Sequence, residues 1–183
     1  MKKNTELLQY KNPYQSTIAF EEFLKSKRAL HQNIKYILDA GCGAGANLHY
    51  FLNRYKDKKF EGWDYSKSQI NKAKKFNKNQ QINFFEKNLL KIKKKKYKFD
   101  LVYSIHTFCV FKNISKAINS VANLNSKFIA INSLFFEGYL DVLIHIRDLK
   151  DKKITDQNPD ADFNIHSLPK TIEFFKKKKY ELI

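Results

Sequence analysis

Three glycines at every second position follow a short apolar run that ends in an acid, in ILDAGCGAGAN over residues 37–47. Glycine lets the backbone turn where a side chain would clash, and it lets another molecule approach the backbone closely. Gly41, Gly43 and Gly45 therefore predict a loop that binds a ligand at the end of a strand. An acidic residue, Asp39, stands two positions before the first of these glycines.

The loop fits a pattern found in dinucleotide-binding proteins. Residues 41–46, GCGAGA, match G-x-G-x-x-G/A, so a nicotinamide or flavin nucleotide has to be considered. Asp39 argues against this ligand, because a carboxylate at the strand end would face a pyrophosphate at close range. The same carboxylate suits a ligand with positive charge and no phosphate. S-adenosylmethionine is such a ligand, since it carries an α-ammonium and a sulfonium.

A second acid, Asp64, ends the next expected strand in FEGWDYS. A carboxylate at this place can accept hydrogen bonds from both hydroxyls of a ribose. Tyr65, which follows directly, offers an aromatic surface for an adenine ring. The two residues indicate a ligand that contains adenosine, a feature that S-adenosylmethionine shares with the dinucleotides.

Strands and helices are expected to alternate along the chain. The hydrophobic pattern predicts strands at 36–39, 59–64, 82–86, 99–105 and 127–134, and helices at 16–32, 46–55, 66–76, 114–123 and 168–178. Such alternation predicts an α/β fold with a doubly wound, mostly parallel sheet that helices cover on both faces. Ligands of these sheets bind beyond the carboxyl ends of the strands, where the glycine loop lies.

The alternation breaks after residue 134. Residues 139–149 predict an apolar helix that leads into a charged loop, and YELI, at 180–183, predicts the beginning of a further strand. The chain is expected to be one domain over 1–183. Within it we distinguish an N-terminal helical cap over 1–34, a cofactor-binding core over 36–134 and a substrate or lid insert over 135–166.

Together these motifs resemble the class I S-adenosylmethionine-dependent methyltransferases. LDAGCGAGAN is similar to the first motif of that family, GWDYS to its ribose-binding acid, and FDLVYSIHTF to its fourth-strand motif. The resemblance implies a Rossmann-like sheet of seven strands whose last strand is antiparallel, and S-adenosyl-L-methionine as the cofactor. Because the chain reaches only YELI where the sixth strand would begin, we expect a fold that is truncated before strands six and seven.

The resemblance also implies roles for individual residues. The implied cofactor-binding residues are Asp39, Gly41, Cys42, Gly43, Asp64, Tyr65 and Asn88. The first four would line the methionine end, with Cys42 contributing mainly its backbone. Asp64 would hold the ribose and Tyr65 would flank the adenine. Asn88 stands where the family commonly has an acid, and its amide oxygen would accept a hydrogen bond from the adenine amino group.

His106 is the expected general base. It directly follows the fourth expected strand, whose end borders the methyl-transfer site in the family. A hydroxyl or a neutral amine must lose a proton on methylation, whereas a thiolate or a carboxylate need not. His145 and His166 in the insert are further candidates if the insert folds over the site. Each of the three histidines can instead have a structural role.

The expected enzyme is a bacterial methyltransferase that acts without a metal on a hydroxyl or amine of a small molecule or glycan precursor. No compact set of metal ligands is present in the sequence. Parts of the segment 134–169 are similar to bacterial methyltransferases found among cell-surface glycan enzymes. Two other functions remain open: an RNA methyltransferase, and a truncated, non-catalytic methyltransferase-like protein.

The charge leaves the partner open. Lys and Arg number 35 and Asp and Glu 18, which gives a formal net charge of +17. An anionic partner such as nucleic acid would explain this charge, and so would AT-rich coding, which favours Lys, Asn, Ile and Phe. No apolar run approaches the ~20 residues of a membrane span. The N-terminal residues resemble no signal peptide, and the two cysteines show no redox spacing, so a cytoplasmic protein is expected.

Overall fold

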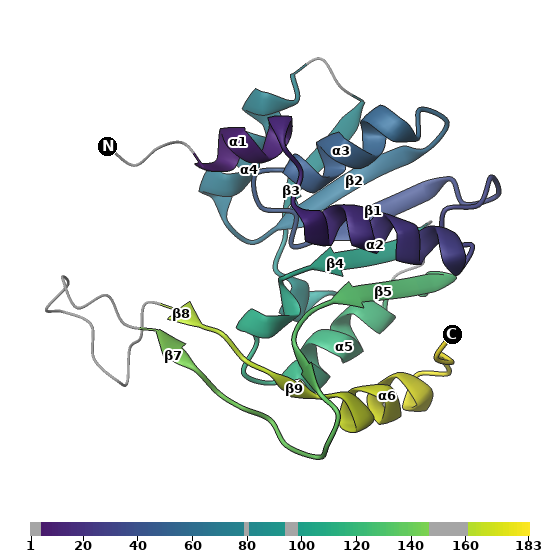
Figure 1. The fold of residues 1–183 in the computed structure, drawn as a ribbon, viewed down its shortest axis with the longest axis vertical. Coiled ribbons are helices and arrows are strands. Elements are labelled where there is room, and N and C mark those ends of the chain that lie inside the picture. Colours follow the sequence, from purple (N-terminus) through teal and green to yellow (C-terminus); the bar gives the residue numbers. More distant parts are fainter. Residues whose placement is uncertain (1–4, 79–80, 94–98, 147–160) are drawn as a thin grey trace, which may run out of the picture.

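The computed structural model describes residues 5–78, 81–93, 99–146 and 161–183. Five strands of this part form one parallel sheet in the order β3-β2-β1-β4-β5 (Figure 1). They are β1 (Tyr36–Ala40), β2 (Lys59–Asp64), β3 (Ile82–Glu86), β4 (Leu101–Ile105) and β5 (Phe128–Asn132). The strand order reverses between β1 and β4, so their carboxyl ends border the crevice in which such sheets bind ligands. The expected doubly wound parallel sheet is confirmed.

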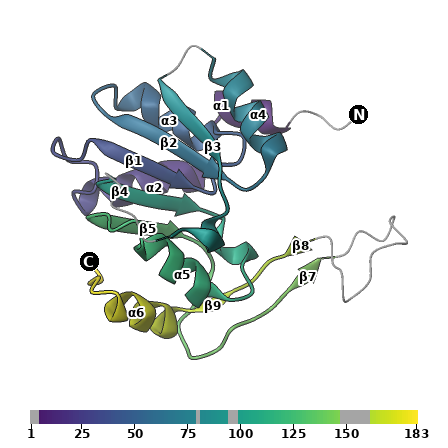
Figure 2. The same ribbon diagram turned by 180° about the vertical axis from the view of Figure 1, so that it is seen from behind.

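Helices cover both faces of this sheet (Figures 1 and 2). They are α1 (Thr5–Lys11), α2 (Gln15–Ser26), α3 (Ala46–Arg54), α4 (Lys67–Phe76), α5 (Ile114–Ala122) and α6 (Leu168–Lys177), with short 3-10 turns η1 (Leu89–Lys91) and η2 (Phe108–Val110). Side chains alternate between the faces of a strand. Ile37 therefore packs in a core with α2, α3 and α4, while Leu38 packs with α5. None of the helices described is long and apolar enough to cross a membrane.

Serine side chains cap the first turns of two helices. Ser66 Oγ accepts a hydrogen bond from Gln69 N at 3.4 Å at the start of α4, and Ser167 Oγ accepts one from Lys170 N at 3.3 Å at the start of α6. Such caps satisfy N–H groups that have no partner inside the helix. They fix the helix starts at the junctions that follow the carboxyl ends of strands.

A buried carboxylate holds α2 against α3. Glu21 accepts hydrogen bonds from Tyr50 Oη at 2.5 Å, Tyr55 Oη at 2.6 Å and Arg54 Nε at 2.9 Å. Burial alone would raise the pKa of Glu21, but these donors stabilise its charged form and lower the pKa to about 2. The N-terminus of α2, with Ser16, is thereby held in a fixed position beside the sheet.

The helix expected at 139–149 is not present in the part of it that the structure describes. Residues 142–146 instead form an extended chain that pairs with 161–165, including β7 (His145–Ile146) and β8 (Ala161–Asp162). At its base β6 (Phe135–Phe136) pairs with β9 (His166–Ser167). This ribbon projects from the body of the protein (Figures 1 and 2). Pairing with a distant segment overrode the local helical pattern, and residues 147–149 lie outside the described residues.

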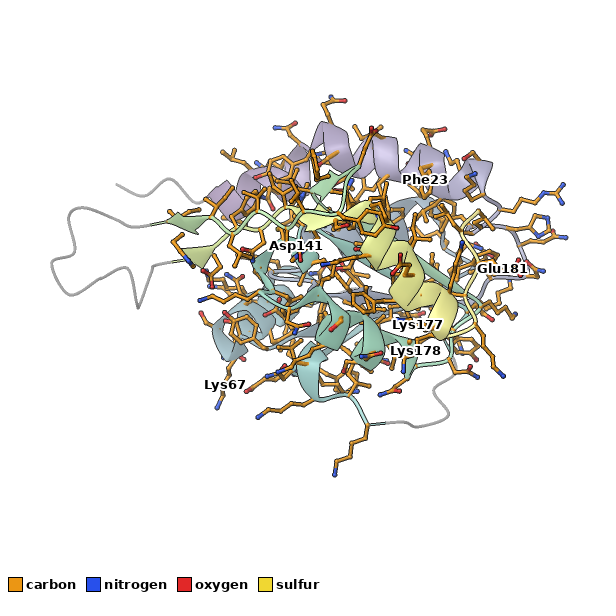
Figure 3. The ribbon with its side chains drawn as sticks, turned by 90° about the horizontal axis from the view of Figure 1, so that it is seen from below. Phe23, Lys67, Asp141, Lys177, Lys178 and Glu181 are labelled. Atoms are coloured by element: carbon orange, nitrogen blue, oxygen red, sulfur yellow. The ribbon has the colours of Figure 1, made fainter. Side chains whose placement is uncertain are left out.

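The strand expected from Tyr180 is also wrong. Tyr180 turns back against the end of α6, where its N–H donates to Phe175 O and its hydroxyl donates to Ser126 O at 3.0 Å. Among the described residues no strand pairs with the outer edge of β5. A groove of about 610 Å³ lies there between α2, β5 and α6, and Phe23 and Glu181, labelled in Figure 3, are among its lining residues. The groove is distinct from the glycine loop.

Candidate functional site

The glycine loop that follows β1 needs glycine for two different reasons. Gly41 has φ +89°, and a Cβ there would lie 2.1 Å from Thr107 Oγ1, so this position has no room for a side chain. Gly43 also has a left-handed backbone, with φ +52°, but a Cβ there would meet nothing within 4 Å. Gly43 therefore leaves its backbone open to an approaching ligand, whereas Gly41 permits close packing of the loop on the end of β4.

Four N–H groups of the loop already donate to protein oxygens. Gly41 N and Cys42 N both donate to Trp63 O, Gly43 N donates to Asp64 Oδ2, and Gly45 N donates to Cys42 O, at 2.7 to 3.0 Å. Loops that bind phosphate direct free N–H groups at the anion. In this loop four N–H donors are occupied, and one of their acceptors is a carboxylate. The geometry therefore favours a ligand without a phosphate at this point.

Asp64 fixes the end of β2 to both neighbouring segments. Its Oδ2 accepts the hydrogen bond from Gly43 N at 2.9 Å, and its Oδ1 accepts one from Ser66 N at 2.8 Å. The side chain is half-buried, and Tyr65 directly after it is 75% exposed. The structure thus brings together three residues predicted from the sequence: an open glycine, a carboxylate and an exposed aromatic ring.

Asp39, which is expected to line the methionine end of the ligand, lies under the glycine loop, and this role stays a prediction. It is buried beneath the loop beside Tyr103, its neighbour in the β1–β4 register, and neither carboxyl oxygen has a hydrogen-bond partner among the described residues. Burial raises the pKa of Asp39 to about 8, and the charge of Asp64 adds to this rise although the nearby Tyr103 hydroxyl opposes it. The side chain follows the strand alternation into the core.

Two further predicted residues have local contacts of their own. The Cys42 thiol is buried under the loop, and burial raises its pKa, so only the backbone of Cys42 is placed to serve the site. Asn88 is exposed, and its Oδ1 accepts a hydrogen bond from Leu90 N at 2.8 Å, which caps η1. The oxygen expected to meet an adenine is therefore engaged locally, and this role of Asn88 stays a prediction.

His106 lies at the carboxyl end of β4 with its ring exposed. Its Nε2 is 3.3 Å from Ser16 Oγ in the first turn of α2. The residue has φ +57°, and a left-handed backbone in a residue other than glycine stores strain that is found mainly at functional sites. The next residue, Thr107, donates its hydroxyl to Gly41 O at 3.2 Å. This contact places His106 next to the glycine loop, at the reversal of the strand order.

The other two candidate histidines have structural partners. His145 lies on the ribbon, where its Nδ1 is 2.6 Å from Asp162 Oδ1. His166 is completely buried at the base of the ribbon, with its Nε2 3.2 Å from Phe108 O. Neither ring is directed to the glycine loop by these contacts. Among the residues that the structure describes, no three His, Cys, Asp or Glu side chains gather in a possible metal site.

Tyr10 is a site residue whose role the sequence did not reveal. Its hydroxyl donates a hydrogen bond to Ala44 O in the glycine loop and accepts one from Asn77 Nδ2 at 2.8 Å. Its ring packs edge-on against the ring of His49, with 4.9 Å between the two ring centroids. These contacts fasten α1 over the loop. The hydrogen bonds of Tyr10 could not be predicted from the local sequence, because the partners lie 34 to 67 residues away.

A family model described as "Methyltransferase domain" matches residues 37–126, from β1 to the end of α5. This range holds the glycine loop, Asp64 and His106. Residues 37–126, just under half of the chain, thus match a methyltransferase domain, which supports a class I S-adenosylmethionine-dependent methyltransferase. None of the curated proteins matches this chain in sequence.

Solved structures of methyltransferases share its fold. The plantazolicin methyltransferase BpumL, in complex with a pentazolic desmethylPZN analog and SAH, is 22% identical with a TM-score of 0.52 over 66% of this chain and 46% of that one. Magnesium protoporphyrin IX methyltransferase (ChlM) from Synechocystis PCC 6803, with bound SAM, is 13% identical with a TM-score of 0.61 over 92% and 69%. Streptomyces venezuelae DesVI is 15% identical with a TM-score of 0.55 over 79% and 64%. This chain thus spans about half the length of BpumL.

Proposed function

We propose that this protein binds S-adenosylmethionine at the glycine loop and transfers its methyl group to a hydroxyl or amine of a small molecule or glycan precursor. One observation carries the proposal. The Asp64 carboxylate, at the carboxyl end of β2, is held against the N–H of Gly43, next to the open side of that glycine. The carboxylate can therefore accept a hydrogen bond from a ribose hydroxyl at the place where a ligand can come close to the backbone.

The residues present fit this cofactor. Gly43 would admit the methionine part, Asp64 would accept hydrogen bonds from the ribose hydroxyls, and Tyr65 would stack on the adenine. Four N–H donors of the loop already have protein acceptors, which disfavours a pyrophosphate at this place. When bound, the cofactor supplies an electrophilic methyl group on its sulfonium.

His106 would act as a general base on the methyl acceptor. Ser16 Oγ, 3.3 Å from Nε2, would orient the exposed imidazole, and its other nitrogen, Nδ1, can accept the proton of an incoming hydroxyl or amine. The contact from Thr107 to Gly41 fixes the distance between this base and the loop, and methyl transfer depends on such alignment. The names of BpumL and ChlM, methyltransferases of plantazolicin and magnesium protoporphyrin IX, support a small-molecule acceptor.

Methyl transfer itself tests the proposal. Purified protein is incubated with methyl-tritiated S-adenosylmethionine and either low-molecular-mass metabolites or total RNA. We expect label in the metabolites and none in the RNA. The net charge of +17 favours RNA as the second candidate acceptor, and label in RNA, with binding that falls steeply with salt, would select it. Cofactor binding without transfer to either pool would indicate a non-catalytic protein.

A further inference from the structure

β5 is an outer strand of the parallel sheet, and its edge away from β4 is open. Phe128 N–H donates to Asp100 O, and Asn132 O accepts the N–H of His106, so Phe128 and Asn132 turn their backbone groups toward β4. Backbone groups alternate in direction along a strand. The N–H and C=O groups of residues 129 and 131 therefore point away from the sheet, where no strand of the described residues pairs with them.

The groove along this edge has two apolar walls. Phe23 and Leu24 of α2 line one wall, Ile172 and Phe175 of α6 line the other, and β5 lies between them. Figures 1 and 2 show α2 and α6 on either side of β5. The side chains of a strand alternate between two faces, so a strand added here would direct them in turn toward α2 and toward α6. Such a strand needs apolar side chains on both faces.

One end of the groove is basic. Lys27 directly follows α2, Lys127 directly precedes β5, and Lys178 and Lys179 follow α6, so all four line the groove at the amino end of β5. Lys127 pairs with Asp100 at 2.7 Å. The other three lysines have no ion pair with an acid in the part of the chain that the structure describes. Their charge is therefore available to an anionic group that enters this end of the groove.

We propose that the open edge of β5 binds an extended segment of a partner protein as an additional antiparallel strand. The segment has apolar side chains in its middle and acidic residues at the end that lies beside the lysines. Backbone hydrogen bonds to Ile129 and Ile131 would supply affinity, while the two helix walls and the lysines would select the side chains. Antiparallel pairing is slightly the more stable arrangement, and it places the acidic residues at the carboxyl end of the bound segment.

Charge decides between this occupant and a second copy of the chain. Among the described residues that line the groove, Glu181 is the only acid, so an acidic segment complements the lysines. A second copy would bring a further formal charge of +17 to this basic edge, which disfavours its approach. The site is also separate from the glycine loop and His106, which lie at the carboxyl ends of β1 and β4. The inference therefore does not rest on the proposed function.

Fluorescence anisotropy with designed peptides tests the inference on the full chain. The probe is the peptide TVIVSEDE, with fluorescein at its amino end and an amidated carboxyl end. Two control peptides each change one property. TVIVSQNQ replaces the three acids by their amides and so removes the charge. TVIVSEDE that is N-methylated at both valines and the isoleucine keeps the side chains but lacks the N–H groups that pair with a strand.

Two pairs of protein variants test the groove itself. Lys178→Glu with Lys179→Glu reverses the charge at its basic end, and Lys74→Glu with Lys75→Glu makes the same change on the exposed side of α4. Ile131→Pro removes an outward N–H, a change that an edge strand tolerates, whereas Ile131→Ala shortens the side chain and keeps the N–H. Urea unfolding confirms that each variant is folded. If Ile131→Pro does not fold, the lysine pair and the N-methylated peptide decide the outcome.

We expect saturable binding of TVIVSEDE to the wild type. Affinity should fall at least tenfold with either control peptide, with the lysine pair of the groove, and in Ile131→Pro relative to Ile131→Ala, but less than twofold with the lysine pair of α4. The absence of saturable binding overturns the inference, and so does equal binding of the N-methylated peptide, which would make the groove a site for apolar ligands. A wild-type dimer in sedimentation that Ile131→Pro converts to monomers would also overturn it, since a second copy would then be the occupant.

Discussion

The Asp64 carboxylate accepts a hydrogen bond from Gly43 N at 2.9 Å and so joins the end of β2 to the glycine loop at the end of β1. The same carboxylate accepts the N–H of Ser66 at the start of α4. One side chain therefore both shapes the loop and offers its charge to a ligand. Its removal should affect ligand binding more than any other single change in the loop.

We expect Asp64→Ala to weaken binding of S-adenosylhomocysteine by about 2–4 kcal/mol, since a charged acceptor contributes ~1.5–3 kcal/mol per hydrogen bond. Calorimetry measures the loss. Asp64→Asn is the matched variant, because it keeps one acceptor oxygen and should lose less. A loss below about 0.5 kcal/mol in Asp64→Ala would show that this residue does not hold the ribose.

Two glycine variants should separate packing from binding. Gly41→Ala places a Cβ 2.1 Å from Thr107 Oγ1 and should lower the free energy of unfolding by several kcal/mol, on the order of other overpacked sites. Gly43→Ala meets no protein atom, so it should cost only about 1 kcal/mol of backbone strain while reducing cofactor affinity at least tenfold. Urea unfolding and calorimetry give the two quantities. Full cofactor affinity in Gly43→Ala would mean that the ligand does not approach this glycine.

His106→Ala should lower turnover by ~10²–10⁴-fold, the usual range for a lost general base, and leave the affinity for S-adenosylhomocysteine nearly unchanged. Ser16→Ala should have a smaller effect on turnover, because Ser16 only orients the ring. Steady-state methyl transfer with the natural acceptor measures both. If His106→Ala keeps full turnover, the acceptor arrives deprotonated or another group takes its proton.

The buried carboxyl of Asp39 predicts a pH dependence of stability. Burial raises its folded-state pKa to about 8 from an ordinary value of 3.8. Between these values the folded state holds a proton that the unfolded state releases, so Asp39 lowers the free energy of unfolding progressively from about pH 4 to pH 8. We expect Asp39→Asn to flatten this decline in urea unfolding measured across that range. An unchanged slope would show that the carboxyl is ionised in the folded protein.

Local signals in the sequence sufficed for much of the sheet. The expected ranges for β2 and β3 agree with the structure at both ends, and the helices expected at 66–76 and 168–178 begin within one residue of those starts. These features depend on hydrophobic periodicity and on polar groups next to a helix end, which are properties of neighbouring residues. The positions of Gly43 and Asp64 at the ends of two expected strands were likewise predicted from neighbouring residues.

Features that depend on distant partners could not be predicted in this way. Residues 142–146 form a strand because they pair with 161–165, and Tyr10 belongs to the site because its hydroxyl reaches Ala44. The burial of Asp39 beside Tyr103 also depends on a distant partner, because β4 supplies that neighbour. Sequence spacing locates such residues on an element and leaves their long-range neighbours undetermined.

Calorimetric titration of the wild-type protein with S-adenosylhomocysteine and, separately, with NAD tests the central proposal most directly. Four N–H donors of the glycine loop already have protein acceptors, which disfavours a pyrophosphate there and suits a ligand without one. We therefore expect saturable binding of S-adenosylhomocysteine and no heat of binding with NAD. Tight binding of NAD without any response to S-adenosylhomocysteine would contradict the assignment of this site to a methyl donor.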